Sequence, residues 1–231
     1  MSSARLTTDS VGFVLPLLDT EVSEAKKIFD VNVFGVIEVC KAFAPLLIVS
    51  KGTIINIGSV AGTATIPWQG YYNASKAAIH LLTSQLRIEL SPFGVSAICV
   101  VGSVVRTRFF DNMPTKSLPP ESLYAAGAEE ISIVQSGAVA GQDGWDADVF
   151  AHSVVTKALK RTPKLIHWTG DSANVMWFVG TFLWGTFWVC INTCAQFTLA
   201  NSMQDLVTIL PLRFKFRELT AKIHAAQKSK R

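Results

Sequence analysis

Two short apolar runs that each follow a long helical pattern constrain the fold of this chain more than any other feature. Residues 53–57 (Thr-Ile-Ile-Asn-Ile) lie between glycines, and residues 95–101 form a second run of the same kind. Helical spacing of apolar side chains predicts helices over residues 21–49 and 70–91. Strands that are apolar on both faces are typical of a parallel sheet covered by helices. The sequence therefore predicts an α/β fold.

The region that follows the second run has a different pattern. Residues 112–145 contain three prolines and several glycines, which favour turns, so we expect a mobile flap there. A helix is predicted over residues 146–160 and a short strand over residues 164–168. These elements complete a first predicted domain over residues 1–170.

The last segment, residues 171–231, forms a second predicted region. Residues 172–204 carry no charge, and residues 175–191 are their most apolar part. A bilayer-spanning helix needs about 20 predominantly apolar residues, so this predicted helical segment is near the lower limit. Seven of the last 19 residues are Lys or Arg, which suits an anionic cytoplasmic membrane surface. The alternatives are a buried C-terminal helix and a contact between copies of the chain in a homo-oligomer.

Composition excludes several classes of protein. A chain with 49% hydrophobic and 16% charged residues does not have the composition of a disordered protein. A net charge of +4 is lower than is usual for nucleic-acid-binding proteins, so we expect no nucleic-acid partner. The four cysteines and four histidines follow no zinc or redox spacing, which predicts no metal site.

The pair Tyr72 and Lys76 is the strongest local indication of chemistry. Two residues four apart on a helix share one face. An ammonium group beside a phenol stabilises the phenolate and lowers its pKa, which makes the phenol a usable proton donor to a carbonyl oxygen. The alternative is that Tyr72 is a core aromatic side chain and Lys76 a solvated charge.

Two further polar residues lie at positions that fit the same site. Ser59 follows the predicted strand over residues 53–57, and the carboxyl end of a parallel strand faces the ligand crevice. Its hydroxyl can therefore hold the substrate oxygen that Tyr72 protonates. Asn32 lies in the interior of the first predicted helix, where asparagine is disfavoured.

These four residues resemble the Asn–Ser–Tyr–Lys tetrad of the classical short-chain dehydrogenase/reductase family, and the resemblance covers most of residues 11–168. It implies a Rossmann-like doubly wound sheet and an oxidoreductase that acts on alcohols and ketones. It implies that Tyr72 is the general acid/base and that Ser59 positions the carbonyl. It also implies that Lys76 lowers the tyrosine pKa and holds the nicotinamide ribose, while Asn32 orders a proton-relay water near Lys76.

A further family motif, Pro-Gly-x-Val-x-Thr, follows the second strand. Here residues 102–107 read Gly-Ser-Val-Val-Arg-Thr, so Val105 and Thr107 match and the Pro-Gly pair does not. The resemblance implies that Val105 and Thr107 contact the nicotinamide carboxamide. Arg106 and Arg108 are candidates for a substrate phosphate, because guanidinium binds phosphate with two hydrogen bonds; a solvated pair of charges is the alternative.

A narrower resemblance is to the fungal 1-acyl-dihydroxyacetone-phosphate reductases. It implies reduction of an acylated ketone with NADP(H), and a location on the cytoplasmic face of the endoplasmic reticulum or on lipid droplets. A cytoplasmic location and a secondary-metabolite ketone are the alternatives. The resemblance lies in residues 16–20, 29–35, 42–47, 122–124, 146–151 and 167–170.

The family's glycine-rich turn, which binds the cofactor pyrophosphate at a helix N-terminus, has no counterpart in this sequence. We therefore expect an incomplete sheet in which the first βαβ repeats are absent and the strand over residues 53–57 has an unpaired edge. Two hypotheses follow. The chain is a ketoreductase of lipid-like substrates, or it is a non-catalytic remnant that acts through membrane or partner contacts.

Overall fold

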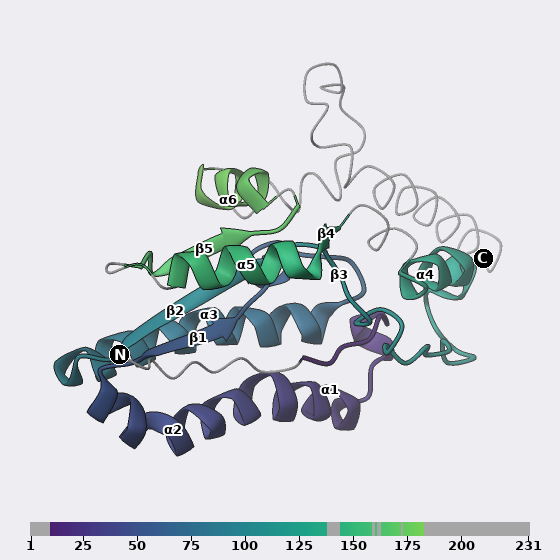
Figure 1. Ribbon diagram of the computed structural model, residues 1–231. Helices are drawn as coiled ribbons and strands as arrows, with labels where there is room; N and C mark the ends of the chain where they lie inside the picture. Colours follow the sequence, from purple (N-terminus) through teal and green to yellow (C-terminus); the bar gives the residue numbers. More distant parts are fainter. Residues whose placement is uncertain (1–9, 138–143, 159, 161–162, 172, 183–231) are drawn as a thin grey trace.

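The computed structural model describes residues 10–137, 144–158, 160, 163–171 and 173–182. Its centre is a parallel sheet with strand order β1-β2-β5 (Figure 1). The strands are β1 (Thr53–Ile57), β2 (Ser96–Gly102) and β5 (Ile166–Thr169). Ile55 pairs with Ile98, and Cys99 pairs with Ile166. The predicted Rossmann-like α/β fold is confirmed, with strand positions within two residues of those expected.

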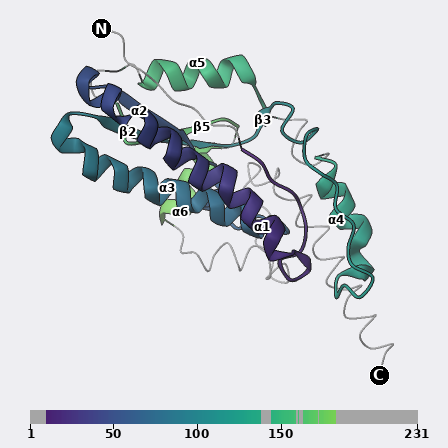
Figure 2. The same cartoon turned by 90° about the horizontal axis from the view of Figure 1, so that it is seen from below.

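Helices cover both faces of this sheet (Figures 1 and 2). On one face, α2 (Val36–Ser50) and α3 (Gly70–Leu90) pack against Ile54 and Ala97. On the other face, α5 (Ala147–Ala158) packs against Ile55 and Val100. Neighbouring strand residues therefore point into different layers, as strand geometry requires.

The first predicted helix is helical over its length but is not a uniform α-helix. It consists of α1 (Val22–Phe29), a π-helical turn (Asp30–Gly35) and α2. The wider turn contains Asn32, which is buried. Short π-helical turns are frequent at functional sites. The whole stretch Val22–Ser50 is the one helix among the described residues that is long and apolar enough to cross a bilayer.

The region predicted to be a turn-rich flap contains a helix. A 3-10 turn (Ala125–Gly127) leads into α4 (Ala128–Gln135). The side-chain amide of Gln135 donates hydrogen bonds to the carbonyl oxygens of Val14 (2.9 Å) and Lys116 (2.8 Å). The proline and glycine content did not indicate this helix, which the contacts with the N-terminal segment stabilise; a mobile flap stays a prediction.

Two short elements follow the sheet at its carboxyl end. β3 (Val105–Arg106) pairs in parallel with β4 (Trp145–Asp146), which directly precedes α5. After β5, α6 (Ala173–Phe182) places Met176 against the cluster that contains Trp168. The rest of the predicted apolar segment and basic tail lies outside the described residues.

Among the described residues β1 pairs with β2 alone, so its other edge has no strand beside it. This agrees with the expected incomplete sheet. The segments that follow β1 and β2 carry Ser59, Val105 and Thr107, whereas Asn32, Tyr72 and Lys76 lie on helices.

Candidate active site

The ring of Tyr72 lies near the start of α3, between the N-terminal segment and the loop after β3. Its centroid is 5.7 Å from that of Phe109, with a tilt of 44° between the rings. A Cβ on Gly12 would lie 3.0 Å from a carbon of the Tyr72 ring. Glycine at position 12 therefore allows the backbone to approach the tyrosine closely.

The hydroxyl of Tyr72 belongs to a cluster of three hydroxyl groups, with hydrogen bonds to the side chains of Ser59 and Ser10. Burial raises the pKa of the Tyr72 phenol, and the two hydrogen bonds oppose this effect without overcoming it. The lowered pKa expected from Lys76 is therefore not found here. Ser59 was predicted from the sequence and Ser10 was not, because nothing in the local pattern around Ser10 indicates a contact with residue 72.

Lys76 is buried beside this cluster. Its ammonium group donates a hydrogen bond to the carbonyl oxygen of Ile57 at 3.1 Å and lies 5.8 Å from the centroid of the Tyr72 ring. Burial lowers the pKa of Lys76 to about 8, and Cys99 opposes this shift. A side chain that is 3% exposed is not a solvated surface charge, so the alternative interpretation of Lys76 is excluded.

The side-chain amide of Asn32 joins the N-terminal segment to α3. It accepts a hydrogen bond from the Val11 amide and donates one to the Val11 carbonyl, both at 2.8 Å. Its nitrogen also donates to the hydroxyl of Ser75 at 3.0 Å. The π-helical turn thus places Asn32 where it holds the backbone that crosses Tyr72. Its role toward a water molecule near Lys76 stays a prediction.

Ser59 lies at the N-cap of a 3-10 turn (Val60–Gly62), and its hydroxyl oxygen accepts a hydrogen bond from the Ala61 amide at 3.1 Å. Its own amide donates to Nε2 of His80 at 3.2 Å. His80 was not predicted from the sequence to belong to the site. Its position one helical turn beyond Lys76 is the signal that could have identified it.

The predicted contacts to the cofactor carboxamide lie on the loop that begins with β3. Val105 is half-buried, and the hydroxyl oxygen of Thr107 accepts a hydrogen bond from the Phe109 amide at 3.3 Å. Arg106 lies 3.8 Å from Asp146 in an exposed ion pair. That pair favours the interpretation of Arg106 as a surface charge over a phosphate ligand.

The described residues contain no group of three or more His, Cys, Asp or Glu side chains that could hold a metal ion. Cys40 and Cys99 are buried free thiols. Burial raises the pKa of both, that of Cys99 to about 11, so neither is a reactive thiolate. The other two cysteines, at positions 190 and 194, lie outside the described residues.

The arrangement has the chemistry of a proton-transfer site. One buried phenol can give a proton to an oxygen atom, and the adjacent Ser59 hydroxyl can hold that oxygen by a second hydrogen bond. The buried ammonium group of Lys76 adds positive charge close to the Tyr72 ring. All three groups lie where β1 ends, which is the usual ligand edge of a parallel sheet.

Comparison with known proteins points to dehydrogenases. Residues 10–117 match the family described as short chain dehydrogenase. The short-chain dehydrogenase virD of Hypocrea virens is 35% identical over 176 residues, which are 76% of this chain and 60% of virD. The chain spans about 60% of the length of the curated relatives it matches.

Solved structures share the fold. A short-chain dehydrogenase from Streptomyces avermitilis aligns with a TM-score of 0.62 at 22% identity, over 74% of this chain and 62% of that one. A short chain dehydrogenase from Burkholderia cenocepacia, solved in complex with NADP, aligns with a TM-score of 0.52 at 21% identity. That alignment covers 76% of this chain and 64% of the Burkholderia chain.

Proposed function

Because residues 10–117 belong to the short-chain dehydrogenase family, whose members bind NAD(P), we propose that this chain reduces a ketone to an alcohol with NADPH. The observation that carries the proposal is the contact between the hydroxyls of Tyr72 and Ser59 beside the buried ammonium group of Lys76. At neutral pH the Tyr72 phenol carries the proton that the proposed step requires.

In the proposed step Tyr72 gives its proton to the carbonyl oxygen of the substrate. The Ser59 hydroxyl donates a hydrogen bond to the same oxygen and stabilises the negative charge that develops there. Lys76, close to the ring, stabilises the phenolate that remains after transfer. NADPH, when bound, supplies the hydride that the carbonyl carbon accepts, so that one hydride and one proton convert the ketone into the alcohol.

The chain has groups that fit the nicotinamide end of this cofactor. The contact described for Lys76 uses one of its three N–H donors, on the carbonyl of Ile57, which leaves donors for ribose hydroxyls. Val105 and Thr107 would supply the contacts to the carboxamide. The sequence has no Gly-x-x-x-Gly-x-Gly turn for the pyrophosphate, so residues of this chain are matched to the nicotinamide end of the cofactor only. The choice of NADP(H) is supported by the NADP complex of the Burkholderia structure.

We propose an acylated or lipid-like ketone such as 1-acyl-dihydroxyacetone phosphate as the substrate. The motifs shared with the fungal reductases support this class. The surroundings of Tyr72 support it too, since Phe109 contacts the phenol and Phe110 packs edge-on against Phe109 at 5.3 Å. An apolar wall of this kind favours a substrate with apolar groups next to its carbonyl. A secondary-metabolite ketone is the competing substrate class.

We further propose that the chain associates with the cytoplasmic face of the endoplasmic reticulum or with lipid droplets. The uncharged residues 172–204 and the basic residues at the end of the chain support this location. Sedimentation with vesicles checks it. We expect the chain to bind vesicles with anionic lipids, and retention in the supernatant at low and high salt would contradict the proposal.

The decisive experiment measures NADPH binding and NADPH oxidation by the 231-residue chain. We expect saturable binding, and turnover with acylated ketones that exceeds turnover with short ketones. Replacement Tyr72→Phe should abolish turnover and leave binding nearly unchanged. A chain that neither binds NADPH nor reduces any ketone would overturn the proposal and support the non-catalytic hypothesis.

A further inference from the structure

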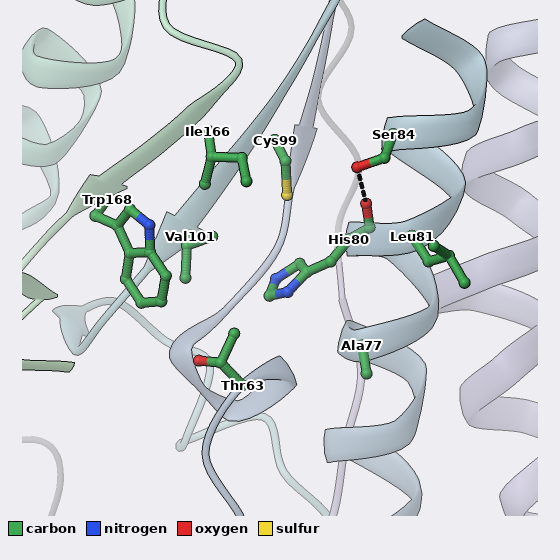
Figure 3. Close-up of a pocket in the computed structure, with 9 residues that line it drawn as sticks. All are labelled: Thr63, Ala77, His80, Leu81, Ser84, Cys99, Val101, Ile166 and Trp168. Atoms are coloured by element: carbon green, nitrogen blue, oxygen red, sulfur yellow. Dashed lines mark hydrogen bonds between the residues drawn. The ribbon is translucent and has the colours of Figure 1, made fainter. Parts of the chain in front are cut away.

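His80 lies on α3 one turn beyond Lys76, at the edge of a pocket of about 280 Å³ between α3 and the strands β2 and β5. In Figure 3 its imidazole points from the helix toward the part of the sheet that carries Cys99 and Val101. The imidazole lines this pocket and brings Nε2 within 3.2 Å of the Ser59 amide nitrogen.

The backbone around Ser59 is shaped to fit this imidazole. A Cβ on Gly58 would lie 2.3 Å from Nε2 of His80, and a Cβ on Gly62 would lie 2.7 Å from its Cε1. Contacts this short are excluded for real side chains, so glycine at both positions lets the loop approach the ring. The segment from Gly58 to Gly62 therefore encloses the imidazole and presents the Ser59 amide to it.

Lys76 and His80 bind the end of β1 at two successive points. The ammonium group of Lys76 donates to the carbonyl of Ile57, and His80 accepts from the amide of Ser59. The two contacts have opposite polarity and come from adjacent turns of one helix. Together they fix the position of the Ser59 loop relative to the helix that carries Tyr72.

We propose that His80 is a positioning residue of the site: its neutral imidazole holds the Ser59 amide and thereby places the Ser59 hydroxyl against Tyr72. The hydrogen bond requires an unprotonated Nε2, which places the ring proton on Nδ1. A protonated ring has donors at both nitrogens and cannot accept this bond. The part of the proposal that concerns catalysis rests on the proposed ketone reduction.

The first test measures hydrogen exchange of the Ser59 amide by NMR, which requires no turnover. Replacement His80→Phe keeps a ring of similar size without an acceptor, and we expect exchange at Ser59 to accelerate about tenfold. His80→Gln supplies an acceptor and should restore most of the protection. The Gly58 amide, bonded to the Val100 carbonyl at 2.7 Å, is the internal control and should not change.

Leu81→Ala is the matched control variant, because Leu81 lines the same pocket and is 74% exposed. It should leave exchange at Ser59 unchanged. Unaltered Ser59 exchange in folded His80→Phe, or a His80→Gln variant as fast as His80→Phe, would overturn the proposal. If His80→Phe does not fold, the imidazole ¹⁵N shifts of the unaltered chain decide: a proton on Nδ1 supports the proposal, and one on Nε2 overturns it.

Measurements of kcat and KM distinguish a positioning role of His80 from a purely structural role. For His80→Phe we expect kcat to fall by about tenfold to a hundredfold, with the KM for NADPH nearly unchanged and partial recovery in His80→Gln. A uniform loss of active protein would lower kcat equally in both variants and would contradict a positioning role. If the unaltered chain has no reductase activity, the proposed function fails and the exchange experiment still tests the contact.

Discussion

Two buried regions share α3 but are built from different chemistry. The site cluster (Asn32, Ser59, Tyr72, Lys76 and His80) consists of buried or half-buried polar side chains, and Lys76 and His80 hydrogen-bond the backbone where β1 ends. The apolar cluster packs α2 and α3 on the sheet and consists of Val36, Cys40, Leu47, Ile54, Ile79, Val95 and Ala97. Apolar packing stabilises wherever volume is filled, whereas each polar contact depends on a particular partner. Substitutions in the first region should therefore change activity, and substitutions in the second should change stability.

The largest expected effect is the loss of activity in Tyr72→Phe. Removal of the only proton donor in the proposed step should lower kcat by about 10²–10⁴-fold, the usual contribution of general acid catalysis. The free energy of unfolding should fall by no more than about 1–2 kcal/mol, the cost of the lost hydroxyl contacts, since the ring and its contact with Phe109 remain. Turnover and chemical denaturation measured on the same preparations check both expectations.

The neighbouring tyrosine provides the control for that experiment. Tyr71 packs with the cluster around Phe13, Leu15 and Ile28 and has no contact with the hydroxyl cluster among those described. Tyr71→Phe should keep kcat within a few-fold of the unaltered chain. Equal losses of kcat in Tyr71→Phe and Tyr72→Phe would show that activity does not depend on the Tyr72 hydroxyl in particular. The distinction between the site cluster and the surrounding packing would then be wrong at this end of α3.

The second prediction concerns the apolar cluster. Ile79 is 1% exposed, and Ile79→Ala should lower the free energy of unfolding by about 2–5 kcal/mol because it leaves a cavity. The variant that remains folded should keep the kcat of the unaltered chain. Ile88→Ala on the same helix is the matched control, since Ile88 is 70% exposed, and should change stability by less than about 0.5 kcal/mol.

The sequence predicted the apolar cluster better than the details of the site. The strand Thr53–Ile57 was predicted with the bounds that the structure shows, because a β-branched run between glycines is a local signal. The spacing of Ser59, Tyr72 and Lys76 likewise predicted that they meet. The contact of Ser10 with Tyr72 joins segments that are distant in sequence, so no local pattern could indicate it. The spacing of His80 from Lys76 places it on the same face of the helix, but its partner Ser59 lies on another element.

One expectation failed and one helix was not predicted, for physical reasons that only the packed structure shows. Burial raises the pKa of Tyr72 more than its neighbours lower it, whereas the isolated Tyr–Lys pair indicated a lowered pKa. The predicted flap contains α4, because Gln135 finds backbone acceptors across the chain. Helical periodicity also could not reveal the π-helical turn, which changes the direction of Asn32 without interrupting the helix.

The third prediction tests a polar contact inside the apolar region. The amide of Asn56 donates to the Thr83 hydroxyl at 2.9 Å, and that hydroxyl donates to the Ile79 carbonyl at 2.6 Å. Thr83→Val keeps the shape but leaves the buried Asn56 amide without its acceptor, which should cost about 1–3 kcal/mol of unfolding free energy. Thr83→Ser keeps the hydroxyl and should be closer to the unaltered chain. If Thr83→Val is as stable as the unaltered chain, the hydrogen bond between Asn56 and Thr83 adds nothing to stability beyond the packing of the side chain.

The smallest expected effect is a dependence of stability on pH that arises from His80. Burial, and then the charge of Lys76, lower the pKa of His80 from 6.5 to about 4. Between these values the unfolded chain binds more protons than the folded one, so the free energy of unfolding falls as the pH falls through this window. From pH 7 to pH 5.5 the loss should be about 1 kcal/mol for this histidine. Urea denaturation at both pH values measures it.

His80→Gln isolates this contribution from that of the other groups. The pKa of His167 is lowered to about 4 as well, so two histidines among the described residues contribute in this way, and His80→Gln keeps one of these contributions. The groups that face His80 are Lys76 on its own helix and Cys99 on β2, and neither changes its charge in this range. The pH-dependent loss should therefore be smaller in His80→Gln by about 1 kcal/mol. An identical pH dependence of stability in both proteins would mean that His80 titrates normally. The contact between His80 and Ser59 would then give the site cluster no property that distinguishes it from the apolar cluster.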